Sequence, residues 1–147
     1  MAELDDQVRQ LLDIEALKRL KARYFRTMDQ KRWDEFAACF TEACVMDVPE
    51  AGVLVTGSAA IASALSGILD GVQTCHHGHM PEIDVTGPDT ATGIWAMFDY
   101  VEFPAAADGT RNGLQGYGHY EETYRRVDGA WKIDSLRLTR LRIDALS

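Results

Sequence analysis

Hydrophobic residues recur every three or four positions through the first thirty residues, which is the period of an amphipathic α-helix. The hydrophobic stripe consists of Leu11, Ile14, Leu17, Leu20 or Lys21, Tyr24 and Met28. Charged residues such as Arg9 and Arg23 lie off the stripe. We predict a helix over residues 4–28, and the width of its stripe indicates that it packs against a large surface such as a sheet.

The helical pattern breaks at residues 29–32, which read Asp-Gln-Lys-Arg. A second, shorter helix is predicted to follow, with Trp33, Phe36 and Phe40 as its hydrophobic positions. Asp29 is placed to N-cap this helix, because an aspartate oxygen can accept hydrogen bonds from the first free backbone amides.

The period changes after the second helix. Hydrophobic runs predict two short strands, at 45–48 and 53–55, which are joined by a turn at residues 49–52. A third helix is predicted from an N-cap at Ser58 to a stop at Gly71. Its hydrophobic positions are Ile61, Leu65, Ile68 and Leu69.

Strand character dominates the second half of the chain, in the segments 74–85, 90–103, 114–127 and 131–145. Turn signals at Gly87-Pro88-Asp89 and Asp128-Gly129 predict two hairpins, which residues 104–113 connect. Helices followed by strands predict an α+β fold, with the helices packed on one face of an antiparallel sheet. Long strands curling around the first helix would leave a pocket between the two.

The composition is ordinary for a soluble globular protein, with 46% hydrophobic and 26% charged residues. The length of 147 residues suits one domain spanning 1–147. The net charge of -8 opposes binding to the phosphates of nucleic acid. No run is long enough to span a membrane, no signal-peptide pattern is visible, and the three cysteines lack framework spacing. We expect a cytoplasmic protein with no nucleic-acid or membrane partner.

Three of the four histidines lie within residues 74–83, on a segment predicted to be a strand. Successive side chains of a strand point to opposite faces, so His77 and His79 share one face with Cys75. His76 points to the other face. Two histidines and a thiol can ligate a metal, but the sequence positions no further ligand to complete such a site. We therefore predict no metal site and expect these three side chains to line a sheet face or a subunit contact.

Asp99 lies in a strand that is hydrophobic on both faces, where a carboxylate is costly to bury unless it is paired or functional. It shares a face with Trp95, Met97 and Val101, which we expect to form an apolar, substrate-binding wall of the pocket. A role in the site and a structural pairing with an arginine are both open for this aspartate.

Two further features of the last strands are candidates for substrate binding. Arg140 and Arg142 share a face by alternation and could grip a carboxylate or phosphate, with ion pairing across the sheet as the alternative. His119 follows Gly116-Tyr117-Gly118, whose glycines leave room for a close approach to the strand. His119 is therefore a candidate pocket residue, with a surface position as the alternative.

Several short motifs are spread along nearly the whole chain: Arg23-Tyr24 with Asp29, Trp33-Asp34, Cys39-Phe40-Thr41-Glu42-Ala43, Gly57, Thr74-Cys75-His76, Tyr120-x-Glu122-x-Tyr124 and Asp128-Gly129-x-Trp131-x-Ile133. Together with the order of elements, they resemble the SnoaL-like branch of the nuclear transport factor 2-like superfamily. The resemblance implies a cone-shaped, curved antiparallel or mixed sheet that is closed by the long N-terminal helix and two shorter helices.

The resemblance also implies a site. The positions of the catalytic tyrosine, aspartate, histidine and aspartate of bile acid 7α-dehydratase are matched by Tyr24, Asp29, His76 and Asp99. Asp29 and His76 also match the aspartate–histidine pair of scytalone dehydratase. Met28 and Val48 replace the two tyrosines by which that enzyme holds a water, which argues against its substrate and water geometry. Tyr24 and Asp29 are about 140° apart around an ideal helix, so they share a site only if the helix ends between them.

By this resemblance the chain is a cofactor-independent lyase, dehydratase-like, or an isomerase for a small apolar cyclic substrate such as a steroid or polyketide. His76 would take a proton from carbon, Asp29 would orient the imidazole, and Tyr24 with Asp99 would assist the departing oxygen or the enolate. A homodimer or homotrimer is implied as well. The alternative is a non-catalytic ligand-binding or assembly subunit, as in ring-hydroxylating dioxygenase small subunits. In that case Asp29 would bind only backbone amides and His76 would be exposed.

Overall fold

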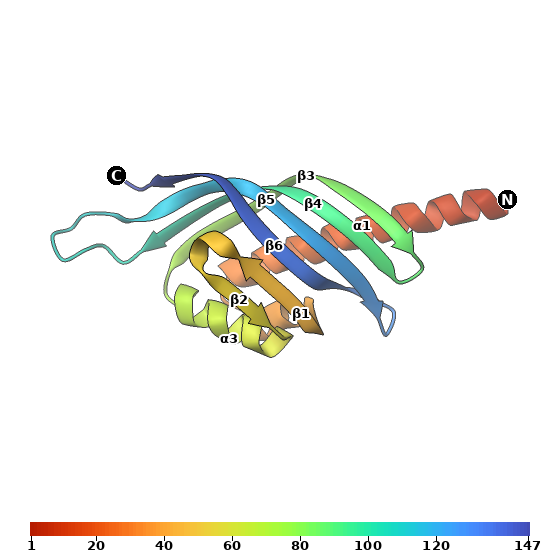
Figure 1. The fold of residues 1–147 in the computed structure, drawn as a ribbon, viewed down its shortest axis with the longest axis horizontal. Coiled ribbons are helices and arrows are strands. Elements are labelled where there is room, and N and C mark those ends of the chain that lie inside the picture. The colour runs from red at the N-terminus through yellow and green to blue at the C-terminus, as the bar shows by residue number, and fades with distance from the viewer.

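Six strands form one curved, mixed sheet in the computed structural model, which describes residues 1–147 (Figure 1). Their order across the sheet is β2-β1-β6-β5-β4-β3. Strand β1 runs parallel to β6, and all other neighbours are antiparallel. The strands are β1 Phe40–Val48, β2 Val53–Thr56, β3 Gln73–Gly87, β4 Thr90–Phe103, β5 Asn112–Val127 and β6 Ala130–Ala145. The predicted α+β fold and both predicted hairpins are confirmed.

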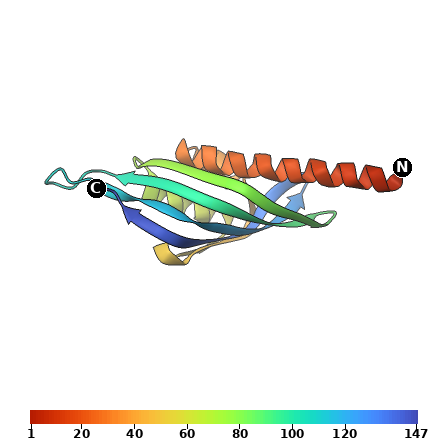
Figure 2. The ribbon, with the colours of Figure 1, turned by 90° about the horizontal axis from the view of Figure 1, so that it is seen from above.

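The long helix α1, Ala2–Asp29, lies along one face of the sheet, and its first turns extend past the end of the β3–β4 hairpin (Figures 1 and 2). No glycine or proline interrupts it. The stripe is buried from Leu17 onward, but Leu11 is 66% exposed, since polar residues such as Gln10 and Asp13 take the positions that face the β3–β4 turn at this end. The predicted stripe is therefore wrong at its N-terminal end. The helix ends before Lys31, whose positive φ of 60° reverses the chain.

Neither predicted N-cap is correct. Helix α2 spans Trp33–Ala37 with Arg32 at its N-cap, and α3 spans Ser58–Leu69 with Gly57 at its N-cap. No side chain caps either helix. Asp29 is instead the last residue of α1, which leaves its carboxylate free to bind β3.

The predicted second helix does not reach Phe40, which begins β1. The reason is a tertiary contact, since Phe40 pairs with Ile133 of β6 and the Ile133 amide donates to the Cys39 carbonyl over 2.8 Å. The turn predicted between the first two strands is a 3-10 helix, η1, over Pro49–Ala51.

A single core of 23 buried hydrophobic residues fills the space between the helices and the sheet. Close approach of α1 to β3 depends on Gly78, because a Cβ there would lie 2.8 Å from Cε2 of Phe25 on α1. This packing brings the C-terminal end of α1 beside β3.

None of the helices has the length and hydrophobicity that crossing a membrane would require.

Candidate active site

A cavity of about 170 Å³ is lined by the sheet, α1, η1 and α3. Fifteen of its eighteen lining residues are hydrophobic, and the exceptions are His76, Asp99 and Arg140. These three come from β3, β4 and β6, so the curved sheet gathers them from distant parts of the chain. Tyr24 and Tyr120 add two hydroxyl groups to the wall. The cavity is thus a largely apolar space with a few convergent polar groups.

His76 is held by Asp29 from the end of α1. The imidazole is buried, with 8% of the residue exposed, and its Nδ1 lies 2.7 Å from Asp29 Oδ1. The backbone amide of His76 donates to Asp29 Oδ2 over 2.9 Å, and the Thr74 hydroxyl donates to Oδ1 over 2.9 Å. The structure therefore brings together two of the predicted site residues, with one carboxylate oxygen on the ring of His76 and the other on its backbone amide.

The environment of Asp29 favours its ionised form. Burial is the largest single influence and raises the pKa, but the hydrogen bonds from the His76 ring, the His76 amide and Thr74 together outweigh it, so the pKa of Asp29 lies below its usual value. An ionised Asp29 accepts a hydrogen bond from Nδ1–H of His76. When Nδ1 of a neutral imidazole carries the proton, Nε2 is a hydrogen-bond acceptor. Nε2 lies 3.9 Å from Asp99 Oδ2, on the side of the ring that faces the cavity wall.

Asp99 and Arg140 form a bidentate ion pair in the cavity wall. Arg140 Nη1 donates to Asp99 Oδ1 over 2.7 Å, and Nη2 donates to Oδ2 over 2.8 Å. These bonds are the main cause of the raised pKa of Arg140. Asp99 is 1% exposed and lies directly opposite His76 in the β3–β4 pairing. Asp99 thus faces the cavity and is also the partner of an arginine, and its role in the site stays a prediction.

The glycines of β5 predict that another group comes close to this strand. That group is the ion pair of Asp99 and Arg140. A Cβ on Gly116 would overlap Arg140 Nη1 and Asp99 Oδ1. Gly116 also pairs with Asp99 across the β4–β5 ladder. Only a residue without a side chain leaves room for the guanidinium at this position.

Tyr24 and Tyr120 lie next to each other at the cavity wall, with their ring centroids 6.0 Å apart and the ring planes at 81°. Burial raises the pKa of both phenols, so they remain protonated hydrogen-bond donors. The helix continues through Asp29, contrary to the condition under which Tyr24 and Asp29 share a site. The two side chains instead act from different directions, because Tyr24 faces the cavity and Asp29 lies behind His76.

A buried polar network that the sequence reasoning missed lies next to these tyrosines. Lys21 and Glu122 are ion-paired with both side chains 0% exposed. Lys21 Nζ lies 3.8 Å from the centre of the Tyr24 ring and 3.6 Å from that of Tyr120. The second Glu122 oxygen accepts from the Tyr124 hydroxyl over 2.5 Å. A charged residue at an inward position of both the helical stripe and a predicted strand is the signal that could have found the pair.

Not all predicted residues reach the cavity. Val101 lines it, whereas Trp95 and Met97 are buried on the same face of β4 but are not part of the wall. His119 is not part of the wall: strand alternation puts it on the outer face while its neighbour Tyr120 points inward, which is the surface position left open as the alternative. Arg142 is exposed and pairs with Asp144 over 2.7 Å, so it does not join Arg140 in binding a carboxylate or phosphate.

The remaining residues of the histidine-rich segment lie on the outer face of the sheet. Cys75, His77 and His79 are exposed, as alternation from His76 predicts, and Cys75 Sγ lies 3.2 Å from His77 Nε2. No group of three or more histidine, cysteine, aspartate or glutamate side chains lies close enough together to hold a metal ion.

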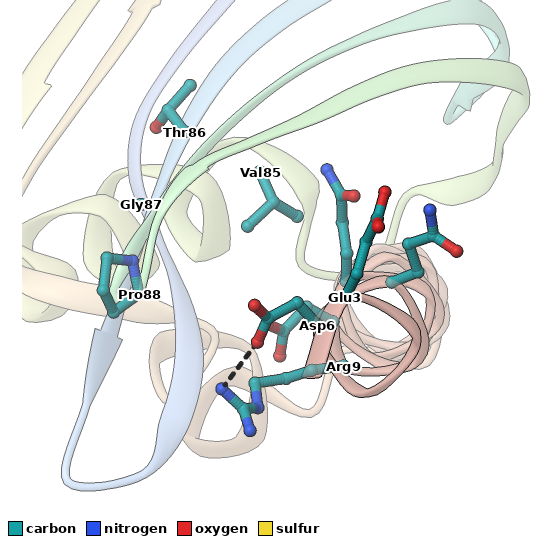
Figure 3. A pocket seen from close by; sticks show the side chains of 10 residues that line it. Glu3, Asp6, Arg9, Val85, Thr86, Gly87 and Pro88 are labelled. Carbon is teal, nitrogen blue, oxygen red and sulfur yellow. Dashed lines mark ion pairs between the residues drawn. The ribbon is translucent and has the colours of Figure 1, made fainter. Parts of the chain in front are cut away.

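A larger hollow of about 640 Å³ lies between the first turns of α1 and the β3–β4 turn (Figure 3). Its wall is polar, with Glu3, Asp6 and Arg9 on the helix and Thr86 on the hairpin, and Arg9 pairs with Asp6 over 3.6 Å. None of the predicted site residues lines it. The smaller apolar cavity, where buried and paired ionisable groups converge, is therefore the candidate active site.

Comparison with known proteins agrees with this fold. The sequence model of the SnoaL-like domain matches residues 9–137. The Probable cyclase FGR4 of Gibberella zeae is 30% identical over 139 residues, which cover 85% of this chain and 89% of that protein. A scytalone dehydratase-like structure from Novosphingobium aromaticivorans has a TM-score of 0.82 at 24% identity, covering 100% of this chain and 93% of the other. A type 2 hexachlorocyclohexane dehydrochlorinase (LinA) has a TM-score of 0.83 at 17% identity, covering 96% and 93%.

Proposed function

Since the chain belongs to the SnoaL-like domain family of the nuclear transport factor 2-like superfamily, we propose that it is a cofactor-independent lyase or isomerase of a small, apolar, cyclic molecule. The similar proteins are named as a cyclase, a dehydratase and a dehydrochlorinase, which supports the conversion of a small molecule. The single observation that carries the proposal is the 2.7 Å contact between the buried His76 ring and Asp29 at the wall of the cavity.

His76 is the base of the proposed reaction. Its Nε2 takes a proton from a carbon of the substrate, and the electron pair of the broken C–H bond forms a carbon–carbon double bond. Asp29 accepts from Nδ1 and stabilises the imidazolium that forms. In a dehydration the imidazolium returns this proton to the departing hydroxyl, which leaves as water. In an isomerisation it returns the proton to another carbon, so the base is regenerated in both cases.

The other polar groups of the wall stabilise the charge that develops on the substrate oxygen. Tyr24 and Tyr120 are protonated phenols that can donate a hydrogen bond to an enolate or a departing oxygen. Asp99 is held by Arg140 and so serves as a hydrogen-bond acceptor for a substrate hydroxyl, not as the proton donor. The apolar remainder of the wall excludes water, which strengthens each of these interactions.

The non-catalytic alternative predicts an exposed His76 and an Asp29 that binds only backbone amides. Asp29 instead contacts the ring of His76 as well as its amide, and the ring is buried. These contacts favour the enzyme over the assembly or ligand-binding subunit.

The test is the substitution His76→Ala, assayed for dehydration of hydroxy-ketones and hydroxy-acyl compounds and for exchange of substrate C–H in D₂O. A positioned general base contributes roughly 10²–10⁴-fold, so we expect a loss of this order in both readouts. His77→Ala is the matched control, since it removes an exposed imidazole one residue away and leaves the cavity intact. Undiminished turnover by His76→Ala would rule the mechanism out.

A further inference from the structure

We infer that the substrate is an uncharged molecule with a single ring that carries a hydroxyl or carbonyl oxygen, and not a steroid. The role of the ring as a substrate rests on the proposed function, whereas its size and charge follow from the cavity alone. Three independent features of the wall carry the inference.

The first feature is the volume of the cavity, about 170 Å³. An engineered apolar cavity of about 150 Å³ in another protein binds benzene, so this volume matches one six-membered ring with small substituents. Sites for drug-sized ligands measure about 300–1,000 Å³. The four fused rings of a steroid exceed a space of this volume, which Leu65, Leu69 and Val101 help to line.

The second feature is that each charged group in the wall already has a partner. Both terminal nitrogens of Arg140 are used by Asp99, and His76 is held by Asp29. A carboxylate or phosphate on the ligand would be buried next to the Asp99 carboxylate and would meet an Arg140 whose charge Asp99 already balances, so its own charge would stay uncompensated. The wall is therefore matched to a neutral ligand, and the predicted grip of Arg140 on an anionic group is not part of the inference.

The third feature is the gap between His76 Nε2 and Asp99 Oδ2. At 3.9 Å the two atoms are too far apart for a direct hydrogen bond. A substrate hydroxyl beside them can donate its one hydrogen to Asp99 Oδ2, which leaves Nε2 open toward a neighbouring carbon, and the phenols of Tyr24 and Tyr120 are protonated donors for a carbonyl. A ring oxygen substituent placed here would bring the adjacent carbon next to the proposed base.

The experiment measures binding and needs no turnover. The probes are cyclohexanol, cyclohexanecarboxylate, decahydro-2-naphthol and a neutral hydroxysteroid, each titrated into the full chain by ligand-observed NMR or calorimetry. We expect cyclohexanol to bind at least about 10-fold more tightly than cyclohexanecarboxylate, a difference of about 1.4 kcal/mol. We expect no saturable binding of the steroid. Equal affinity for the carboxylate, or saturable binding of the steroid, would overturn the inference.

Two variants locate the binding event. Leu65→Ala enlarges the cavity from the α3 side and should admit decahydro-2-naphthol, whereas Ile94→Ala on the exposed outer face should leave all four affinities unchanged. Cyclohexanol binding that neither Leu65→Ala nor a blocking Val101→Phe substitution alters would place the ligand elsewhere and overturn the inference.

The outcomes of these experiments distinguish the proposed mechanism from the proposed size limit of the ligand. Full turnover by His76→Ala removes the mechanism without touching ring binding, and steroid binding removes the size limit without touching the role of His76.

Discussion

Gly116 shows how one residue shapes the site through the side chain that it lacks. The ion pair of Asp99 and Arg140 occupies the space where a Cβ on this strand would stand. The pair in turn sets the charge of the wall and holds Asp99 opposite His76. A methyl group at this point therefore acts on the polar groups of the cavity and not only on packing.

We expect Gly116→Ala to lower the free energy of unfolding by about 1–3 kcal/mol, because the added methyl group displaces a buried guanidinium and carboxylate. Urea unfolding measures the change. Gly67→Ala in α3 is the matched control, since its Cβ would meet nothing within 4 Å and it should be neutral or stabilising by up to about 1 kcal/mol. Equal stability of Gly116→Ala and wild type would contradict the role given to Gly116.

The ion pair of Lys21 and Glu122 links two elements, because it joins α1 to β5 through the core. Its partners extend the link to β4, where Trp95 Nε1 donates to the Tyr124 hydroxyl over 2.9 Å. Burial lowers the pKa of Lys21, while the carboxylate of Glu122 opposes this shift. A fully buried pair of this kind is stable only while both partners are present.

Removing one partner should therefore be costly. We expect Lys21→Met to lower the free energy of unfolding by about 3–5 kcal/mol, since it leaves the Glu122 carboxylate buried without its cation. The double substitution Lys21→Met with Glu122→Gln should recover part of the loss, because the neutral amide oxygen can still accept from the Tyr124 hydroxyl. Chemical denaturation of the two variants provides the comparison. A double variant less stable than Lys21→Met would refute this account of the pair.

Elements with a local signal could be predicted from the sequence, and elements defined by distant contacts could not. The hairpins follow from alternation and from turns such as Asp128-Gly129, both of which act between neighbouring residues. Phe40 continues a helical spacing, yet it begins β1 because it pairs with Ile133 on the last strand. The capping prediction for Asp29 fails for a related reason, since β3 supplies better partners for its carboxylate than the amides of α2.

The site belongs to the whole molecule, because its polar groups come from α1 and four different strands. The family resemblance points to Tyr24, Asp29, His76 and Asp99, and the fold brings all four close to one cavity. The choice of the arginine that pairs with Asp99 depends on the register of β5 and β6 and on the bulge between them. Such register shifts leave no mark in the hydrophobic pattern.

The pH dependence of global stability should show the contacts of Asp29. The pKa of Asp29 is lower in the folded chain than its ordinary value, so its ionised form stabilises the fold above about pH 4, and this contribution is lost as the pH falls through the folded pKa. We expect Asp29→Asn to cost about 1–3 kcal/mol at pH 7, where charge-assisted hydrogen bonds are lost. The difference from wild type should shrink below about pH 4.

Unfolding in urea between pH 3 and pH 7 measures this difference. Asp6→Asn, at an exposed position on the projecting part of α1, serves as the control and should differ little from wild type throughout. A gap between Asp29→Asn and wild type that stays constant, or widens toward acid, would be inconsistent with an ionised Asp29 in the folded chain.

The ionisable and the purely hydrophobic parts of the cavity wall come from two different parts of the chain. Its ionisable groups are carried by α1 and the long strands, whereas η1, β2 and α3 contribute only hydrophobic side chains such as Ala51, Val53 and Ile68. Substitutions confined to these three elements would change the shape of the cavity and leave the proposed proton-transfer groups unchanged. Proteins built on this scaffold can therefore change their ligand specificity while they keep the proposed mechanism.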